Sequence, residues 1–337
     1  MIPHNAPTLG RAETAAAADV ISSGWVAQGP KVKAFEERIA QTLGLEEGGV
    51  VALSSGTAAL FVLLRHLEVC GTTVVMPTYA CSALRNAAVW AGATPSYVDC
   101  GLGSPNAEFG DSVPEGAEVF VAVSSFGIPC DLPTGTKTVV DDACQALGST
   151  VGGTAVGLRT GLGVLSFSAS KLITSGGQGG AIVSSDPALI DAVRDFREFD
   201  CRRDDKIRFN LQMTDLQAAI GEVQLRRLPQ FLERREEIFQ TYASAGVHLL
   251  GPVGSDFDVV ARYRAVVLVK DQSAALSKLW ENGVRAIVPI EKWELLDRHS
   301  WHPHAEDLTQ RAVSLPIYPG LSNSKVAEVI AALDGVL

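Results

Sequence analysis

Short apolar runs alternate with longer amphipathic segments over the first two thirds of the chain. The runs are rich in valine and bounded by glycine, proline or polar residues, which is typical of strands buried on both faces. We expect strands at 49–55, 72–77, 94–99, 118–125, 136–142, 163–168 and 180–185. Several segments between them predict helices, the clearest being the one entered through Gly56 and Thr57. The alternation predicts an α/β fold with a mostly parallel central sheet and helices on both faces.

The pattern changes after residue 214. Residues 214–245 are helical and amphipathic, and Pro229 within them predicts a kink or a break. The remaining residues combine short strand and helix patterns, which indicate a smaller α+β unit. We expect a large domain over 1–235, with an N-terminal arm, and a small C-terminal domain over 236–337, with a helix running across the boundary.

Composition narrows the possible functions. Of the 337 residues, 47% are hydrophobic and 20% charged, so a folded protein is expected. The formal net charge of -10 argues against a nucleic-acid or membrane-surface partner, although a local pocket could still bind a small anion. The N-terminus carries no charged leader before an apolar core, and no apolar run is long enough to span a bilayer. We therefore expect a cytoplasmic protein.

The cysteines give no sign of a metal site. They are Cys70, Cys81, Cys100, Cys130, Cys144 and Cys201. They form no CxxC pair, and no histidine cluster accompanies them. This pattern is typical of small buried thiols in a reducing compartment, and no metal is predicted.

Candidate chemistry lies where the predicted strands end, as is usual for active sites in such sheets. Pyridoxal phosphate would need a lysine amine for its aldehyde, a carboxylate for its ring nitrogen and helix-start amides for its phosphate. Lys171 and Asp142 follow strands, and a helix start with a nearby hydroxyl is offered by Gly56, Thr57, Ala58 and Ser166. Taken one at a time, each feature has a simpler explanation: the turn could be an ordinary turn that binds no anion, the aspartate could cap a helix, and Lys171 could lie on the surface. Their order along the chain favours the joint interpretation.

Longer motifs cover nearly the whole chain in a fixed order. They are SGWVAQGPKVKAFEERIA, SSGTAAL, MPTYACSALRNAAVWAGATPSYVD, SSFGIPCDL, VVDDACQALGS, SFSASK, FNLQMTDLQAAIGEVQLRRL and SLPIYPGLS. By these motifs the sequence resembles the DegT–DnrJ–StrS family of sugar aminotransferases. The resemblance implies the fold-type-I architecture, pyridoxal 5'-phosphate as cofactor, and a homodimer with shared active sites.

The resemblance also implies roles for individual residues. Lys171 would form the Schiff base (an aldimine) with the cofactor and then move a proton, while Asp142 would pair with the ring nitrogen. Gln145 would contact the phenolic oxygen or the ring face. The phosphate would be held by Gly56, Thr57, Ala58 and Ser166, with Asn210 reaching the phosphate of the partner subunit. The substrate would meet Trp25, Gly29 and Pro30, although simple packing explains Trp25 equally well.

Several departures from the family pattern bear on the chemistry. Cys81 stands where the family usually has an aromatic residue that stacks on the cofactor ring. After the lysine the family usually has Gly-Glu-Gly-Gly, whereas Gly177 and Gln178 replace the acid here. Ser168 and Gln212 also stand where other residues are frequent. We expect the choice of substrate, or a departure from ordinary transamination, to depend on Gln178 and its neighbour.

The predicted reaction moves an amino group from glutamate or glutamine to a keto-sugar, which most relatives take nucleotide-linked, or to a keto-cyclitol. Arg85, Arg202, Arg203 and Arg208 could bind a diphosphate or could be surface or interface residues. Two alternatives stay open. One is a pyridoxal-phosphate-dependent elimination or dehydration; a related dehydratase subgroup has histidine instead of the lysine, so Lys171 favours transamination. The other is a non-catalytic regulatory protein that binds the cofactor.

Overall fold

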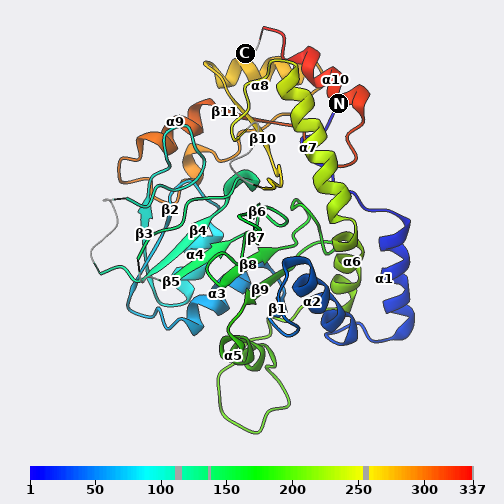
Figure 1. The fold of residues 1–337 in the computed structure, drawn as a ribbon, viewed down its shortest axis with the longest axis vertical. Helices are drawn as coiled ribbons and strands as arrows, with labels where there is room; N and C mark the ends of the chain where they lie inside the picture. The colour runs from blue at the N-terminus through cyan, green and yellow to red at the C-terminus, as the bar shows by residue number, and fades with distance from the viewer. Residues whose placement is uncertain (111–115, 136–137, 253–257, 336–337) are drawn as a thin grey trace.

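A seven-stranded sheet crosses the centre of the computed structural model, which describes residues 1–110, 116–135, 138–252 and 258–335 (Figure 1). Its strands are β1 (Val50–Leu53), β2 (Thr73–Pro77), β3 (Thr94–Val98), β4 (Val119–Val123), β5 (Thr138–Asp142), β8 (Leu162–Ser166) and β9 (Gly180–Ser184). The order is β1-β9-β8-β5-β4-β2-β3, and only β9 runs antiparallel to its neighbours. The predicted mostly parallel sheet is confirmed; residues 136–137 of one predicted strand lie outside the described residues.

Helices cover both faces of the sheet. One face packs against α3 (Gly56–His66), α4 (Ala83–Trp90) and α5 (Pro187–Arg197), and the other against α2 (Pro30–Leu43) and α6 (Asp215–Arg226). On the second face the fully buried Phe35 meets Phe167 edge to face, with ring centres 5.0 Å apart. A buried aromatic side chain of this kind contributes roughly 1.5–3 kcal/mol. No helix within the described ranges is both long and apolar enough to cross a membrane.

The C-terminal third builds a smaller unit around the antiparallel pair β10 (Ala265–Leu268) and β11 (Ala312–Leu315). Its other elements are α7 (Leu228–Ser244), α8 (Gln272–Glu281), η2 (Lys292–Glu294), α9 (Pro303–Arg311) and α10 (Asn323–Ala332). The break expected at Pro229 falls between α6 and α7, because proline fits the first turn of a helix, where no amide partner is needed. The proposed domain boundary at residue 235 lies inside α7.

Three further elements complete the fold. They are α1 (Arg11–Ser23), which packs on α6, the short η1 (Ser125–Gly127), and the hairpin of β6 (Thr150–Val151) and β7 (Thr154–Ala155). The N-terminal segment joins the small unit, since Ile2 N–H donates to Gly283 O (2.7 Å) and Arg285 N–H donates to Ile2 O (2.9 Å). Three residues further on, Asn5 Nδ2 donates to Ser170 O (3.2 Å). The segment therefore runs from the small unit to the neighbour of Lys171.

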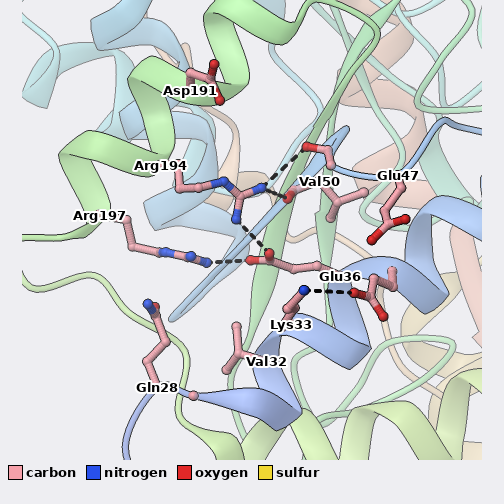
Figure 2. A pocket seen from close by; sticks show the side chains of 12 residues that line it. Gln28, Val32, Lys33, Glu36, Glu47, Val50, Asp191, Arg194 and Arg197 are labelled. Carbon is pink, nitrogen blue, oxygen red and sulfur yellow. Dashed lines mark hydrogen bonds and ion pairs between the residues drawn. The ribbon is translucent and has the colours of Figure 1, made fainter.

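The outer edge of β1 is covered by charged side chains from α2 and α5, and Figure 2 shows the depression of about 410 Å³ that they line. The buried Glu36 accepts a hydrogen bond from Ala52 N–H (2.8 Å) and pairs with both Arg194 and Arg197. Arg194 also donates to Val50 O (3.0 Å), and Arg197 to Ala52 O (3.0 Å). Unpaired strand edges invite pairing with other chains. The ion-pair network satisfies this part of the edge within the chain.

Candidate active site

Lys171 lies in the loop between β8 and β9. The loop folds back on itself, because Phe167 N–H donates to Gly179 O (2.8 Å) and Ala169 N–H donates to Gly177 O (2.8 Å). The Lys171 side chain is half-buried, and its Nζ lies 5.3 Å from the centre of the Tyr263 ring. Tyr263 precedes β10, so a residue distant in sequence forms one side of the lysine's surroundings.

Asp141 and Asp142 end β5 and point to opposite faces of the sheet, because successive side chains of a strand alternate. The buried Asp141 accepts hydrogen bonds from Gly157 N–H (2.7 Å) and from Arg159 Nε (2.9 Å) and Nη2 (2.5 Å), so it is half of a structural ion pair. Asp142, only 3% exposed, accepts from Cys144 N–H (2.9 Å) and interacts electrostatically with Lys171. Asp142 is therefore the carboxylate on the lysine's side.

The start of α3 comes very close to the end of β8 at Gly56. A Cβ atom on Gly56 would lie 3.2 Å from Ser166 Oγ and 3.4 Å from Cys144 Sγ. A Cβ atom on Gly180 would lie 2.4 Å from the Gly56 nitrogen, which as backbone cannot move aside easily. Two glycines thus allow the helix start, the strand end and the Asp142 turn to meet in one place.

The first turn of α3 presents backbone amides at this meeting point. Such amides have no acceptor within their own helix. Ser55 caps the helix and its Oγ accepts from Ala58 N–H (3.0 Å), so the amide of Ala58 is already engaged. Gly56, Thr57 and the Ser166 hydroxyl then form the part suited to an anion, since a helix N-terminus favours negative charge.

A cavity of about 590 Å³ opens beside Lys171. Cys81 is exposed on its wall. Gln145 is in the wall as well, and its Oε1 accepts from Phe126 N–H (2.9 Å). The small unit supplies the opposite side with Tyr263, Arg264, Pro289, Ile290, Trp293, Glu294, Leu295 and Arg298. The cavity therefore lies between the strand ends of the sheet and the loops around β10 and η2.

The protonation of the site follows from burial and proximity. Burial raises the pKa of the Asp142 carboxyl, and hydrogen bonds from Cys144 together with Lys171 offset this only in part. Burial would lower the pKa of the Lys171 ammonium, but Tyr263, Cys144 and Asp142 outweigh it and raise that pKa. Lys171 therefore carries a proton at neutral pH. Its Nζ has to release that proton before it can attack an aldehyde.

These groups fit pyridoxal phosphate. An amine on the β8–β9 loop lines the cavity, a buried carboxylate at the end of β5 interacts electrostatically with that amine, and the helix start after β1 meets Ser166 at the end of β8. The first-turn amides of α3, close to the Ser166 hydroxyl, suit a phosphate, and a buried carboxylate suits a protonated ring nitrogen. In the described parts of the chain, no three His, Cys, Asp or Glu side chains are placed to hold a metal ion.

Several residues predicted to meet substrate lie outside the cavity wall of this chain. Trp25 is 61% exposed, and its indole N–H donates to Gln28 O (3.1 Å). Gly29 lines the depression of Figure 2, and Pro30 begins α2 beside it. Gln178 has an exposed side chain, while its carbonyl accepts from Ser175 Oγ (2.8 Å).

Arg208 and Asn210 belong to the loop before α6. Arg208 is paired with Asp195 (2.9 Å) and Asp204 (2.7 Å), so its guanidinium is already neutralised within the chain. Asn210 is exposed, next to Phe209. Neither residue lines the Lys171 cavity.

Sequence reasoning did not identify Tyr263, Arg264, Trp293 or Arg298 as site residues. They come from the small unit and approach Lys171 only through the tertiary fold. The one available signal was the cluster of two cations around a tyrosine in RYR, directly before an apolar strand. That pattern marks a strand start at least as often as it marks a binding residue.

Comparisons with known proteins identify the family and support the fold. A model of the DegT/DnrJ/EryC1/StrS aminotransferase family matches residues 7–334. The chain is 31% identical over 371 aligned positions to dTDP-4-dehydro-2,3,6-trideoxy-D-glucose 4-aminotransferase of Saccharopolyspora spinosa, covering 98% of this chain and 95% of the other. The crystal structure of aminotransferase TlmJ from Streptoalloteichus hindustanus superposes with a TM-score of 0.90 at 28% identity, covering 99% and 98% of the two chains. The PMP-form of Spr1654 from Streptococcus pneumoniae gives a TM-score of 0.90 at 25% identity, covering 99% and 97%.

Proposed function

The chain belongs to the DegT/DnrJ/EryC1/StrS aminotransferase family and is a pyridoxal-phosphate-dependent sugar aminotransferase, and on this premise we propose its substrates and site residues. The amino donor is glutamate or glutamine. The acceptor is either a nucleotide-linked keto-sugar or a keto-cyclitol. The observation that supports this most strongly is the arrangement around Lys171. Lys171 lines the cavity and interacts with the buried Asp142, and the start of α3 approaches Cys144, whose amide donates to Asp142.

Three groups of the chain would hold the cofactor. Pyridoxal phosphate supplies an aldehyde that binds an amine and a ring that withdraws electrons from it. Lys171 Nζ would bind the aldehyde, and Asp142 would keep a proton on the ring nitrogen. The amides of Gly56 and Thr57 and the hydroxyl of Ser166 would hold the phosphate. Cys81 and Gln145 would lie against the ring from the cavity wall.

Lys171 would also move the proton that transamination requires. Once the substrate amine has displaced it, Lys171 Nζ becomes a free amine inside the cavity. It could then take a proton from the substrate carbon and return it two bonds away, to the carbon on the other side of the transferred nitrogen. The Asp142 carboxylate, on the buried side of the site, would stabilise positive charge while this happens.

A nucleotide-linked acceptor suits the size and rim of the cavity. Trp293 lines the cavity and is 69% exposed, so its ring is available to a planar base. The similar Saccharopolyspora spinosa enzyme is named for a dTDP-linked keto-sugar. A keto-cyclitol would leave the Trp293 end of the cavity without a partner, so the nucleotide-linked class is the first to test.

A second copy of the chain would complete the site. Trp90 (69% exposed) and Phe209 (45% exposed) both pack on Phe61, with ring centres 4.9 and 6.3 Å away, and form an aromatic surface patch. Exposed apolar patches of this kind mark interfaces. Asn210 follows Phe209 directly, so a homodimer that buries the patch would place Asn210 at the interface, where it could reach the partner's cofactor phosphate.

The half-reaction with the donor tests the proposal. Holoenzyme mixed with L-glutamate or L-glutamine should convert the bound cofactor to its pyridoxamine form and release the matching 2-oxo acid. The Lys171→Ala variant should bind cofactor without showing the absorbance of a lysine-bound aldehyde. If none of the amino donors converts the cofactor and a keto-sugar instead loses a substituent, the results would favour a dehydratase. Cofactor binding without turnover of any keto-sugar would favour a regulatory protein.

A further inference from the structure

The Lys171 cavity is strongly cationic although the whole chain is acidic. Besides Lys171, its wall carries Arg85, Arg264 and Arg298, against the single carboxylate of Glu294. Glu294 accepts from Glu291 N–H (2.8 Å) at the start of η2. Among the described residues none of the three arginines forms an ion pair, whereas Arg208, Arg159 and Arg197 do. Unpaired guanidinium groups in a cavity wall favour an anionic ligand.

Arg264 is the arginine placed nearest to the chemistry. Its guanidinium carbon lies 5.3 Å from the centre of the Tyr263 ring, as does Lys171 Nζ. The two cations are therefore no further apart than twice this distance, which is within the length of a substrate. The guanidinium also lies 6.0 Å from the centre of the Phe126 ring, and Arg264 N–H donates to Phe126 O (3.3 Å). Arg264 is half-buried, lies near both rings and lines the cavity.

His4 holds the far side of this guanidinium. Its Nε2 lies 3.4 Å from Arg264 Nη1 and 2.9 Å from Ser314 Oγ. A guanidinium only donates, so Nε2 accepts and the ring proton is on Nδ1. Burial, followed by repulsion from Arg264, lowers the pKa of His4 to about 3, so the imidazole is neutral in the working range of the enzyme. The pairing of Ile2 with Gly283 and Arg285 anchors this histidine beside β11.

From this arrangement we propose that Arg264 binds an anionic group of the substrate, a carboxylate or a phosphate, and that His4 is a positioning residue that aims Arg264 at it. The proposal rests on the proposed function, because it assigns a substrate group to that same cavity. Two substrates offer the chemistry: the carboxylates of the amino donor and the diphosphate of a nucleotide-linked acceptor. Since donor and acceptor occupy the cavity in turn, one guanidinium can serve either or both.

Binding of unreactive anions to the holoenzyme tests the role of Arg264. Glutarate mimics the donor and inorganic pyrophosphate mimics the acceptor, and both are titrated by calorimetry. We expect Arg264→Gln to raise the Kd of at least one probe roughly ten- to a hundredfold, the scale of a lost charge-assisted hydrogen bond. Arg311→Gln, which removes an arginine paired with Asp307 outside the cavity, should leave both Kd values unchanged.

The two probes separate the two sources. A loss for glutarate alone assigns the donor carboxylate, a loss for pyrophosphate alone assigns the acceptor phosphate, and a loss for both assigns a shared site. Unchanged binding of both probes overturns the proposal. If Arg264→Gln does not fold, Arg264→Lys replaces it, because lysine keeps the charge but cannot pair two oxygens at once. A several-fold higher Kd for a probe, with unchanged cofactor affinity, then supports the proposal, and unchanged Kd values for both probes overturn it.

The role of His4 needs its own variants. His4→Leu removes the acceptor, and we expect it to raise the Kd of the Arg264-dependent probe roughly three- to tenfold, with kcat and cofactor affinity little changed. His4→Gln, whose carbonyl can replace Nε2, should restore binding, and Ser314→Ala serves as the control that leaves Arg264 in contact with His4. Equal probe binding in His4→Leu and wild type would overturn the positioning role. If no amino donor reacts while Arg264→Gln still weakens a probe, the proposed function fails and the anion site remains.

Discussion

The two neighbouring aspartates at the end of β5 offer a sharp test of how the fold separates structure from chemistry. Asp141→Asn should destabilise the protein, because it breaks the buried pair with Arg159, whose side chain is only 8% exposed. One carboxylate oxygen would become an amide nitrogen facing donors of Gly157 or Arg159. Breaking a buried pair from one side costs about 3–5 kcal/mol.

Asp142→Asn changes the adjacent residue with the opposite expectation. Asp142 makes no pair with Arg159, and its carboxylate is disfavoured by burial, so the amide should change the free energy of unfolding by less than about 1 kcal/mol. Turnover should fall by about a hundredfold or more, the scale of losing one preorganised electrostatic group. Lys171 would also lose its nearby carboxylate, so the pKa of its ammonium should fall.

Urea unfolding at fixed protein concentration and turnover with saturating cofactor separate the two outcomes. The reasoning is refuted if Asp141→Asn costs no more stability than Asp142→Asn. It is equally refuted if Asp142→Asn keeps wild-type turnover, because the buried carboxylate would then have no part in the chemistry.

Three further predictions concern the sheet edge, the glycine contacts and the cavity rim. Glu36→Gln should lower the free energy of unfolding by about 3–5 kcal/mol, because it leaves two arginines beside β1 without their carboxylate. Glu37→Gln, on the exposed face of α2, should lower it by less than about 1 kcal/mol. Equal values by urea unfolding would disprove the edge network. Gly56→Ala should weaken cofactor binding in a fluorescence titration while the protein stays folded, and Gly180→Ala should lower the melting temperature, because its Cβ meets backbone; the reverse assignment would contradict the close packing at the helix start. Burial raises the pKa of the Asp297 carboxyl, but hydrogen bonds from Ser300, His299 and His302 outweigh burial and hold that pKa well below its usual range. The ionised carboxylate therefore stabilises the protein above about pH 4, and this stabilisation is lost as the pH falls further. Asp297→Asn should flatten the acid limb of a stability–pH profile, and an unchanged limb would exclude this contribution.

Much of the large unit was predictable from local patterns. Strands buried on both faces have continuous apolar runs. A glycine at a strand end followed by a helix indicates an anion site only when a lysine and a carboxylate follow in order. Strand alternation also predicts that Asp141 and Asp142 face opposite sides. It does not predict which of them faces the lysine, because that depends on Arg159, which pairs with Asp141 only in the folded chain.

The rest of the site depends on tertiary structure. Tyr263 and Arg264 lie almost a hundred positions beyond Lys171. His4 reaches Arg264 only because the N-terminal segment pairs with Gly283 and Arg285 in the small unit. No periodicity or spacing encodes such contacts. Asn210 stays a prediction, since a second subunit would have to bring it to a cofactor phosphate. The role of Gln178 in the choice of substrate also stays a prediction.

Borohydride reduction of the holoenzyme, followed by peptide mass mapping, tests most directly whether Lys171 carries the cofactor. Reduction fixes the cofactor to the lysine that carries it, and we expect a single labelled peptide containing Lys171. Prior incubation with glutamate or glutamine should abolish the label, because the cofactor leaves the lysine when it takes up the amino group. A label on another lysine would contradict the site, and a label that persists after every amino donor would contradict amino transfer.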